Sequence, residues 1–103
     1  MPENKYSLNR RLYVAEFIGT FFVVLAPVAL SSGDRSGSTG LLASAFVSGL
    51  IVTAMISVFA HVSSAHFNPA VTLALAFGKR FDWKLVFGYV LSQISGGICA
   101  ALL

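Results

Sequence analysis

The sequence predicts an all-α membrane protein with three transmembrane helices and one re-entrant half-helix. The first observation is composition: 56% of the residues are hydrophobic and 11% are charged, whereas soluble domains carry about 25% charged residues. The second is that apolar residues form three stretches close to the roughly 20 residues that a helix needs to cross a bilayer. The third is a shorter apolar run, residues 70–77, which follows Asn68-Pro69 and cannot cross by itself.

Each segment of this fold has approximate bounds in the sequence. The first span contains one charged residue, Glu16, and the second contains none. Asp82 stands directly before the third span, where it is the expected N-cap. The bounds are 1–11 for a polar, basic tail, 12–30, 41–60 and 83–103 for the three spans, and 61–78 for the re-entrant loop with its half-helix.

The basic residues predict the orientation. Six of the seven Lys and Arg residues lie before the first span or between the second and third spans. Because two spans separate these groups, they fall on one side, which the positive-inside rule assigns to the cytoplasm. A multi-pass protein of the cell membrane, plasma or inner, with a cytoplasmic N-terminus is therefore expected. The six are Lys5, Arg10, Arg11, Lys79, Arg80 and Lys84, and Arg35 is the exception.

Asn68 and Pro69 are predicted to start the half-helix. Asn is a favoured N-cap, Pro at the first helical position gives up an N–H that has no helical partner there, and Gly78 is the matching stop. The helix is about 15 Å long, roughly half the hydrocarbon thickness. Because both flanks lie on the cytoplasmic side, the segment must enter and return. A capped amphipathic helix on the membrane surface is the open alternative.

The chemistry of this turn indicates a pore. The positive end of the half-helix would lie near the membrane midplane, and the capping bond would leave the Asn68 NH2 group free to donate. Such a donor orients a water oxygen while the helix end opposes cations and protons. Irregular backbone at this depth is tolerated only when it is buried in protein or lines a wet cavity. Residues 63–67 are therefore expected to be extended and to offer carbonyl oxygens along a pore.

Other classes of function find no support in the residue pattern. The net charge is +3, but no basic run with interleaved aromatic residues indicates nucleic-acid binding. Cys99 is the single cysteine, which excludes an internal disulfide, and no metal cluster surrounds it. His61 and His66 are not helical neighbours, and no nucleophile–base pair or paired carboxylate is present. We expect neither an enzyme nor a bound metal or cofactor.

Small residues recur at four-residue spacing on the second and third spans. Such stripes let helices approach closely in lipid, where the hydrophobic effect does not drive helix association. They predict a packed bundle without indicating what the bundle does. The stripes are Ala45, Gly49, Thr53 and Ser57 on the second span and Gly88, Ser92, Gly96 and Ala100 on the third.

Three motifs together resemble one family. The loop His66-Phe67-Asn68-Pro69-Ala70-Val71-Thr72 resembles the first signature loop of the aquaporin, or major intrinsic protein, family. The similarity runs from about Tyr13 to Leu103. The supporting motifs are Ala15-Glu16-Phe17-Ile18-Gly19-Thr20-Phe21 in the first span and Gly88-Tyr89-Val90, Gln93 and Gly96-Gly97 in the third.

The resemblance implies a fold of two inverted repeats, of which this chain supplies the first, and usually a homotetramer in the lipid bilayer. The pore turn would be Asn68, Pro69 and Ala70, with backbone carbonyls around Ala65 and His66. The resemblance also makes Glu16 the buried acceptor for the re-entrant loop and Gln93 a brace of the same loop. A near-interface Glu16 paired with Arg10 or Arg11 is the alternative.

Ser48 departs from the family pattern. It stands 20 residues before Asn68, where family members usually place a bulky aromatic residue at the outer constriction. A small, polar side chain there would widen the filter. We therefore expect a complete channel to pass small neutral, glycerol-like solutes as well as water.

The sequence contains one Asn-Pro-Ala and no second inverted repeat. The chain is then a fragment, a truncated product, or a half-channel that pairs with an inverted copy of itself. The charge bias argues against the last, because an inverted copy would place six basic residues outside. The main hypothesis is a passive channel completed by a missing or separate second half. The alternative is a nonconducting subunit that packs with full-length relatives.

Overall fold

The computed structural model describes residues 4–34 and 40–103, which form four helices and contain no strand. Three of the helices are long and apolar enough to cross a membrane, and the fourth is short. This confirms the predicted all-α class with three spans and a shorter helix between the second and third. Arg35, the one basic residue expected outside, lies beyond the described residues. The helices are α1 (Lys5–Gly33), α2 (Leu41–Ser63), α3 (Pro69–Phe77) and α4 (Trp83–Leu102).

The first helix begins earlier than its apolar stretch. The tail expected at residues 1–11 is helical from Lys5, because Asn4 accepts a 3.0 Å hydrogen bond from the Tyr6 N–H and no residue before Leu12 breaks the helix. At 1.5 Å per residue, the 29 residues of α1 extend about 44 Å, more than the roughly 30 Å of hydrocarbon. Its polar first turns therefore have room outside the bilayer.

The short helix α3 starts and stops at the predicted residues, but the left-handed residue lies one position after the stop. Asn68 caps it and Pro69 occupies its first turn. Gly78 ends it, but Gly78 itself has a φ of −78°, and Lys79 takes the left-handed φ of 60°. The Arg80 N–H donates to the Leu75 carbonyl at 2.8 Å, which closes the reversal. The backbone hydrogen bonds, rather than a glycine, turn the chain toward α4.

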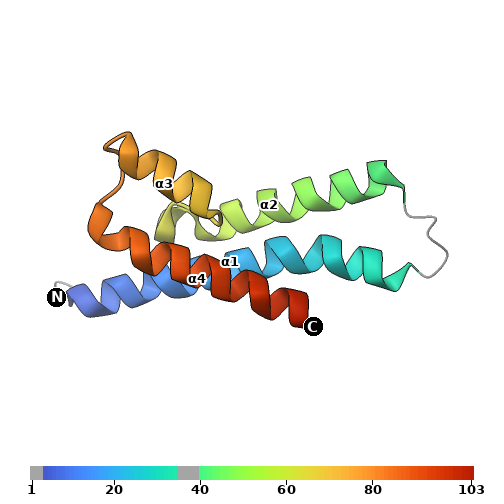
Figure 1. Ribbon diagram of the computed structural model, residues 1–103, viewed down its shortest axis with the longest axis horizontal. Coiled ribbons are helices and arrows are strands. Elements are labelled where there is room, and N and C mark those ends of the chain that lie inside the picture. The colour runs from blue at the N-terminus through green and yellow to red at the C-terminus, as the bar shows by residue number, and fades with distance from the viewer. Residues whose placement is uncertain (1–3, 35–39) are drawn as a thin grey trace.

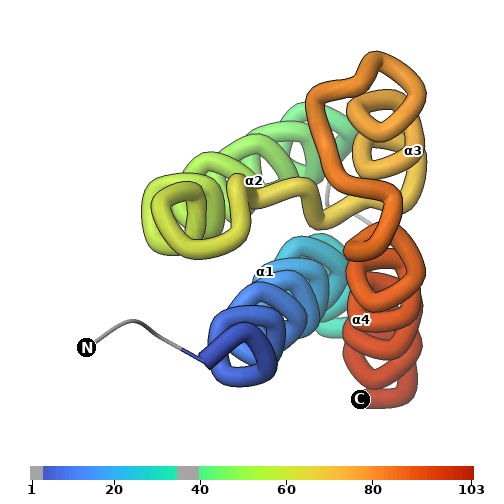
Figure 2. The backbone as a smooth tube through the Cα atoms, turned by 90° about the vertical axis from the view of Figure 1, so that its left-hand side faces the viewer, coloured from blue at the N-terminus to red at the C-terminus, as the bar shows by residue number. Residues whose placement is uncertain are grey.

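The two other long helices, α2 and α4, pack against α1. Helix α1 contacts both α2 and α4, and α3 contacts α4. Figure 1 shows the start of α1 and the turn between α3 and α4 at the same end of the molecule. Figure 2 shows α3 stacked along α4, away from α1. The two basic segments therefore lie at one end, as the predicted topology requires.

The two stripes of small residues have different surroundings. On α4 the stripe packs against α1: a Cβ added to Gly96 would lie 2.5 Å from the Phe17 carbonyl oxygen, and one added to Gly88 would enter the Tyr13 ring. On α2 the stripe from Ala45 to Ser57 is exposed. Of the two stripes, the one on α4 therefore provides close packing against α1 within the described residues.

Adjacent glycines on α4 provide a matched test of this packing. Gly96→Ala should destabilise the fold by about 1–3 kcal/mol, because the new methyl group overpacks against α1 backbone. Gly97→Ala should be neutral or stabilising, by up to about 1 kcal/mol, since its Cβ would meet only Val24 at 3.7 Å. Unfolding in detergent followed by circular dichroism measures both. Equal stability of the two variants would contradict the assigned contact.

Candidate functional site

The connection between α2 and α3 has an unusual backbone. Ser64, Ala65 and Phe67 have φ values of 68°, 51° and 53°, in the left-handed region that L-residues avoid. The expected extended backbone is therefore wrong at these three residues, and Ser63 is the last residue of α2 rather than part of the loop. None of these residues is a glycine, so nothing in the local sequence favours this backbone. Tertiary contacts must hold this conformation.

Glu16 supplies those contacts. Its side chain is 0% exposed, in the middle of α1. Both carboxylate oxygens accept hydrogen bonds, so the acceptor sites are filled by the end of α2, by the loop and by α4. Among the described residues, the donors are Ser63 Oγ at 2.7 Å, the His66 N–H at 3.2 Å, the Phe67 N–H at 2.9 Å and Gln93 Nε2 at 2.7 Å.

The end of α2 is fixed by two further bonds. Ser63 Oγ accepts the Ala65 N–H at 3.2 Å while it donates to Glu16. The Tyr89 hydroxyl, from α4, donates to the Ser63 carbonyl at 2.7 Å. The backbone N–H groups of residues 65, 66 and 67 are therefore all bound within the protein.

Thr72 links the loop to α4. Its Oγ1 lies 3.0 Å from Gln93 Nε2 and 2.9 Å from His66 Nδ1. The His66 ring packs against Phe81 and Tyr89, with centroid distances of 4.7 and 4.9 Å. The side chain of His66 is therefore buried in the protein.

The start of α3 borders a hollow of about 330 Å³. Asn68 Oδ1 accepts the Ala70 N–H at 2.8 Å, so its NH2 group remains for another acceptor. The lining comes from the loop, from the first turn of α3 and from apolar positions of α1 and α2. The lining residues are Val23, Val52, Ile56, Ala65, His66, Phe67, Asn68 and Val71.

Of the residues expected to form the site, the loop members come together and Ser48 lies apart. Ser48 is half-buried on α2 and does not line the hollow. It precedes Val52 by one helical turn and Ile56 by two, so the three share a face of α2. Pro69 and Ala70 form the first turn of α3 and hold Asn68 in place.

Sequence reasoning missed Gly19, Ser63, Thr72 and Tyr89. A Cβ on Gly19 would collide with the Phe67 ring, so only a glycine lets that ring lie against α1. Ser63 is the polar residue that ends an apolar span, which could have marked it as a loop anchor. Thr72 lies one turn after Asn68 inside the motif, whereas nothing in the sequence pairs Tyr89 with the end of α2.

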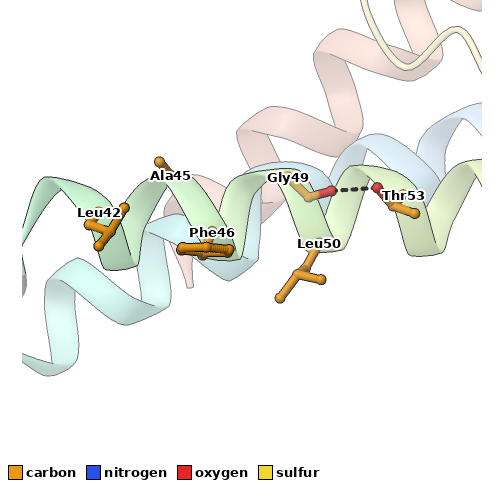
Figure 3. Close-up of a pocket in the computed structure, with 6 residues that line it drawn as sticks. All are labelled: Leu42, Ala45, Phe46, Gly49, Leu50 and Thr53. Atoms are coloured by element: carbon orange, nitrogen blue, oxygen red, sulfur yellow. Dashed lines mark hydrogen bonds between the residues drawn. The ribbon is translucent and has the colours of Figure 1, made fainter.

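A second hollow lies on the outer face of α2 (Figure 3). It is lined by the exposed small-residue stripe and by neighbouring apolar side chains. The Thr53 hydroxyl donates to the Gly49 carbonyl at 2.8 Å, so its polar group is satisfied within the helix. This face is therefore suited to lipid or to another helix. The residues drawn are Leu42, Ala45, Phe46, Gly49, Leu50 and Thr53.

Three apolar helices and a capped half-length helix, with its N-terminal asparagine on a hollow, define a multi-pass membrane protein with a re-entrant segment. The chain belongs to the major intrinsic protein family, whose sequence profile matches residues 3–103. This confirms the resemblance seen in the loop motif.

Named relatives agree with this assignment. Aquaporin Z of Rhodopseudomonas palustris is 38% identical over 99 residues, which cover 93% of this chain and 41% of that protein. Aquaporin NIP1-2 of Oryza sativa is 40% identical, with 92% of this chain and 32% of that protein covered. Glycerol uptake facilitator protein-like 6 of Lactiplantibacillus plantarum is 39% identical, with 88% and 41% covered. The chain thus spans about a third to two fifths of these relatives, whose family is one of channels rather than enzymes.

The Glu16 cluster leads to a prediction about loop order. Glu16→Gln places an amide NH2 group against donors, so at least one buried donor loses its acceptor, which costs about 1–3 kcal/mol. Amide hydrogen exchange at His66 and Phe67 should accelerate. Asp82→Asn, the same chemical change at an exposed N-cap, should leave that exchange unchanged. Equal protection in both variants would show that Glu16 does not hold the loop.

Proposed function

We propose that this chain forms, together with a second half, a passive transmembrane channel for water and small neutral solutes. The observation that carries the proposal is Asn68, which caps a half-length helix through its amide and lines a hollow. The names of the related aquaporins and glycerol facilitator support it.

In this proposal Asn68 orients the permeant. Because Oδ1 is occupied by the Ala70 N–H, the amide meets a water or hydroxyl oxygen as a donor. The nearby N-terminus of α3 carries the positive end of the helix dipole and disfavours cations. The N–H groups of residues 65–67 are bound internally, so we assign their carbonyls the role of acceptors along the path.

The proposed channel needs partners beyond the described residues. A second inverted half would supply another half-helix opposite Asn68. The two half-helices together would close the path at the midplane. We further propose a homotetramer in the cell membrane, plasma or inner, with the N-terminus in the cytoplasm. The basic segments at one end of the fold support this orientation.

A second candidate function is a nonconducting subunit that packs into assemblies of longer relatives. The observation that favours it is the exposed face of α2 in Figure 3, where small residues allow close approach of another helix. Co-purification with a longer relative without added permeability would favour this candidate over the channel.

The role of Asn68 is tested in the complete channel reconstituted into vesicles. Asn68→Asp keeps the oxygen that caps α3 but removes the NH2 donors and adds negative charge. We expect water flux in osmotic shrinkage to fall at least several-fold and cation leak to rise. Light scattering measures the shrinkage, and a potential-sensitive dye measures the leak.

Asn4→Asp is the matched control, because Asn4 caps α1 through the same kind of bond, with Tyr6 N at 3.0 Å. It should leave both fluxes unchanged. Unaltered water flux and ion exclusion in Asn68→Asp would refute the role given to Asn68.

Ser48 is proposed to set which solutes pass. In the complete channel, glycerol and urea should enter along with water. The reason is that Ser48 precedes Val52 by one turn of α2, and its small side chain leaves that part of the helix face open. Ser48→Phe should reduce solute uptake more than water flux, whereas Ser48→Ala should retain both. Proteoliposomes that pass water but exclude these solutes with Ser48 intact would refute this assignment.

A further inference from the structure

The Thr72 hydroxyl lies where the loop, α3 and α4 meet, and its side chain is 0% exposed. Two nitrogen atoms lie within hydrogen-bond distance of Oγ1: Gln93 Nε2 at 3.0 Å and His66 Nδ1 at 2.9 Å. A hydroxyl has one proton to donate and two lone pairs to offer. The direction of these two bonds therefore decides which nitrogen of His66 carries a proton.

Glu16 fixes the first direction. The backbone N–H groups of His66 and Phe67 can only donate, so both carboxylate oxygens of Glu16 act as acceptors. Gln93 must then present its NH2 end, since a reversed amide would set its carbonyl oxygen 2.7 Å from a carboxylate oxygen. The same nitrogen reaches Thr72, so Thr72 Oγ1 accepts from Gln93.

The proton of Thr72 is left to donate. The hydroxyls of Thr53 and Ser57 on α2 donate to carbonyls one turn back, each at 2.8 Å. Within the described part of the chain Thr72 makes no such bond, and the remaining partner of its hydroxyl is His66 Nδ1. A nitrogen that accepts this proton cannot carry one of its own.

We infer that Thr72 is a positioning residue for His66: its hydroxyl donates to Nδ1 and holds the ring neutral, with the single N–H on Nε2. The packing of the ring against Phe81 and Tyr89 keeps Nδ1 at this partner. His66 lines the same hollow as Asn68, so the ring adds no positive charge there. That consequence for permeation rests on the proposed function, whereas the position of the proton does not.

Solid-state NMR of the chain in lipid bilayers, with 15N-labelled histidine, measures the proton positions directly. His61→Gln, at an exposed position, leaves His66 as the one labelled residue of the two histidines. At neutral pH we expect one species, with Nδ1 unprotonated and Nε2 protonated. Thr72→Val, similar in shape but without the hydroxyl, should lose this single state and show the other tautomer or the charged ring. Thr72→Ser should restore it.

A proton on Nδ1 in the protein that retains Thr72 would overturn the inference. An identical histidine spectrum in Thr72→Val and in the protein with Thr72 would overturn it as well. If circular dichroism shows that Thr72→Val does not fold, the unaltered chain and Thr72→Ser provide the test. Loss of the Nε2-protonated state in a folded Thr72→Ser variant would contradict the inference. No transport is measured, so failure here is distinct from failure of the proposed channel.

Discussion

A buried carboxylate on α1 holds the loop on which the candidate site depends. Three residues of that loop have left-handed backbone, which costs roughly 1–2 kcal/mol for each residue with a side chain. Glu16 accepts four hydrogen bonds, and hydrogen bonds to a charged group contribute about 1.5–3 kcal/mol each. The carboxylate has its own cost of burial, which the same donors offset. Loop and acid thus stabilise each other.

This arrangement links the loop to every neighbouring element. Ser63 belongs to α2, Gln93 to α4 and Glu16 to α1, so the polar cluster ties the three long helices at one level. The apolar contacts follow the same plan. Gly19 admits the Phe67 ring against α1, and Gly96 admits α4 against the α1 backbone. A change in the loop therefore alters the packing of the helices, and a change in helix packing alters the loop.

The polar groups inside the fold and those on the hollow have separate tasks. Glu16 and Ser63 accept hydrogen bonds from the backbone N–H groups of the loop. Thr72 and Gln93 are hydrogen-bonded to each other next to the loop. Asn68 is the exception, because its capping bond uses the oxygen and leaves the nitrogen. In the proposed channel, Asn68 would offer this NH2 group to a small neutral molecule from a backbone that internal hydrogen bonds hold in place.

The sequence by itself determined the three spans, the half-helix and its cap, because hydrophobic length and capping are local properties of the chain. It also singled out Glu16, Asn68 and Gln93, though it left two partners open for Glu16. The tertiary structure decided what local patterns do not encode. It gave left-handed backbone to a loop that contains no glycine, and it brought Thr72 and Tyr89 into the cluster. Those features depend on donors and acceptors that are far apart in the chain. These groups come together because α1 packs against α2 and α4.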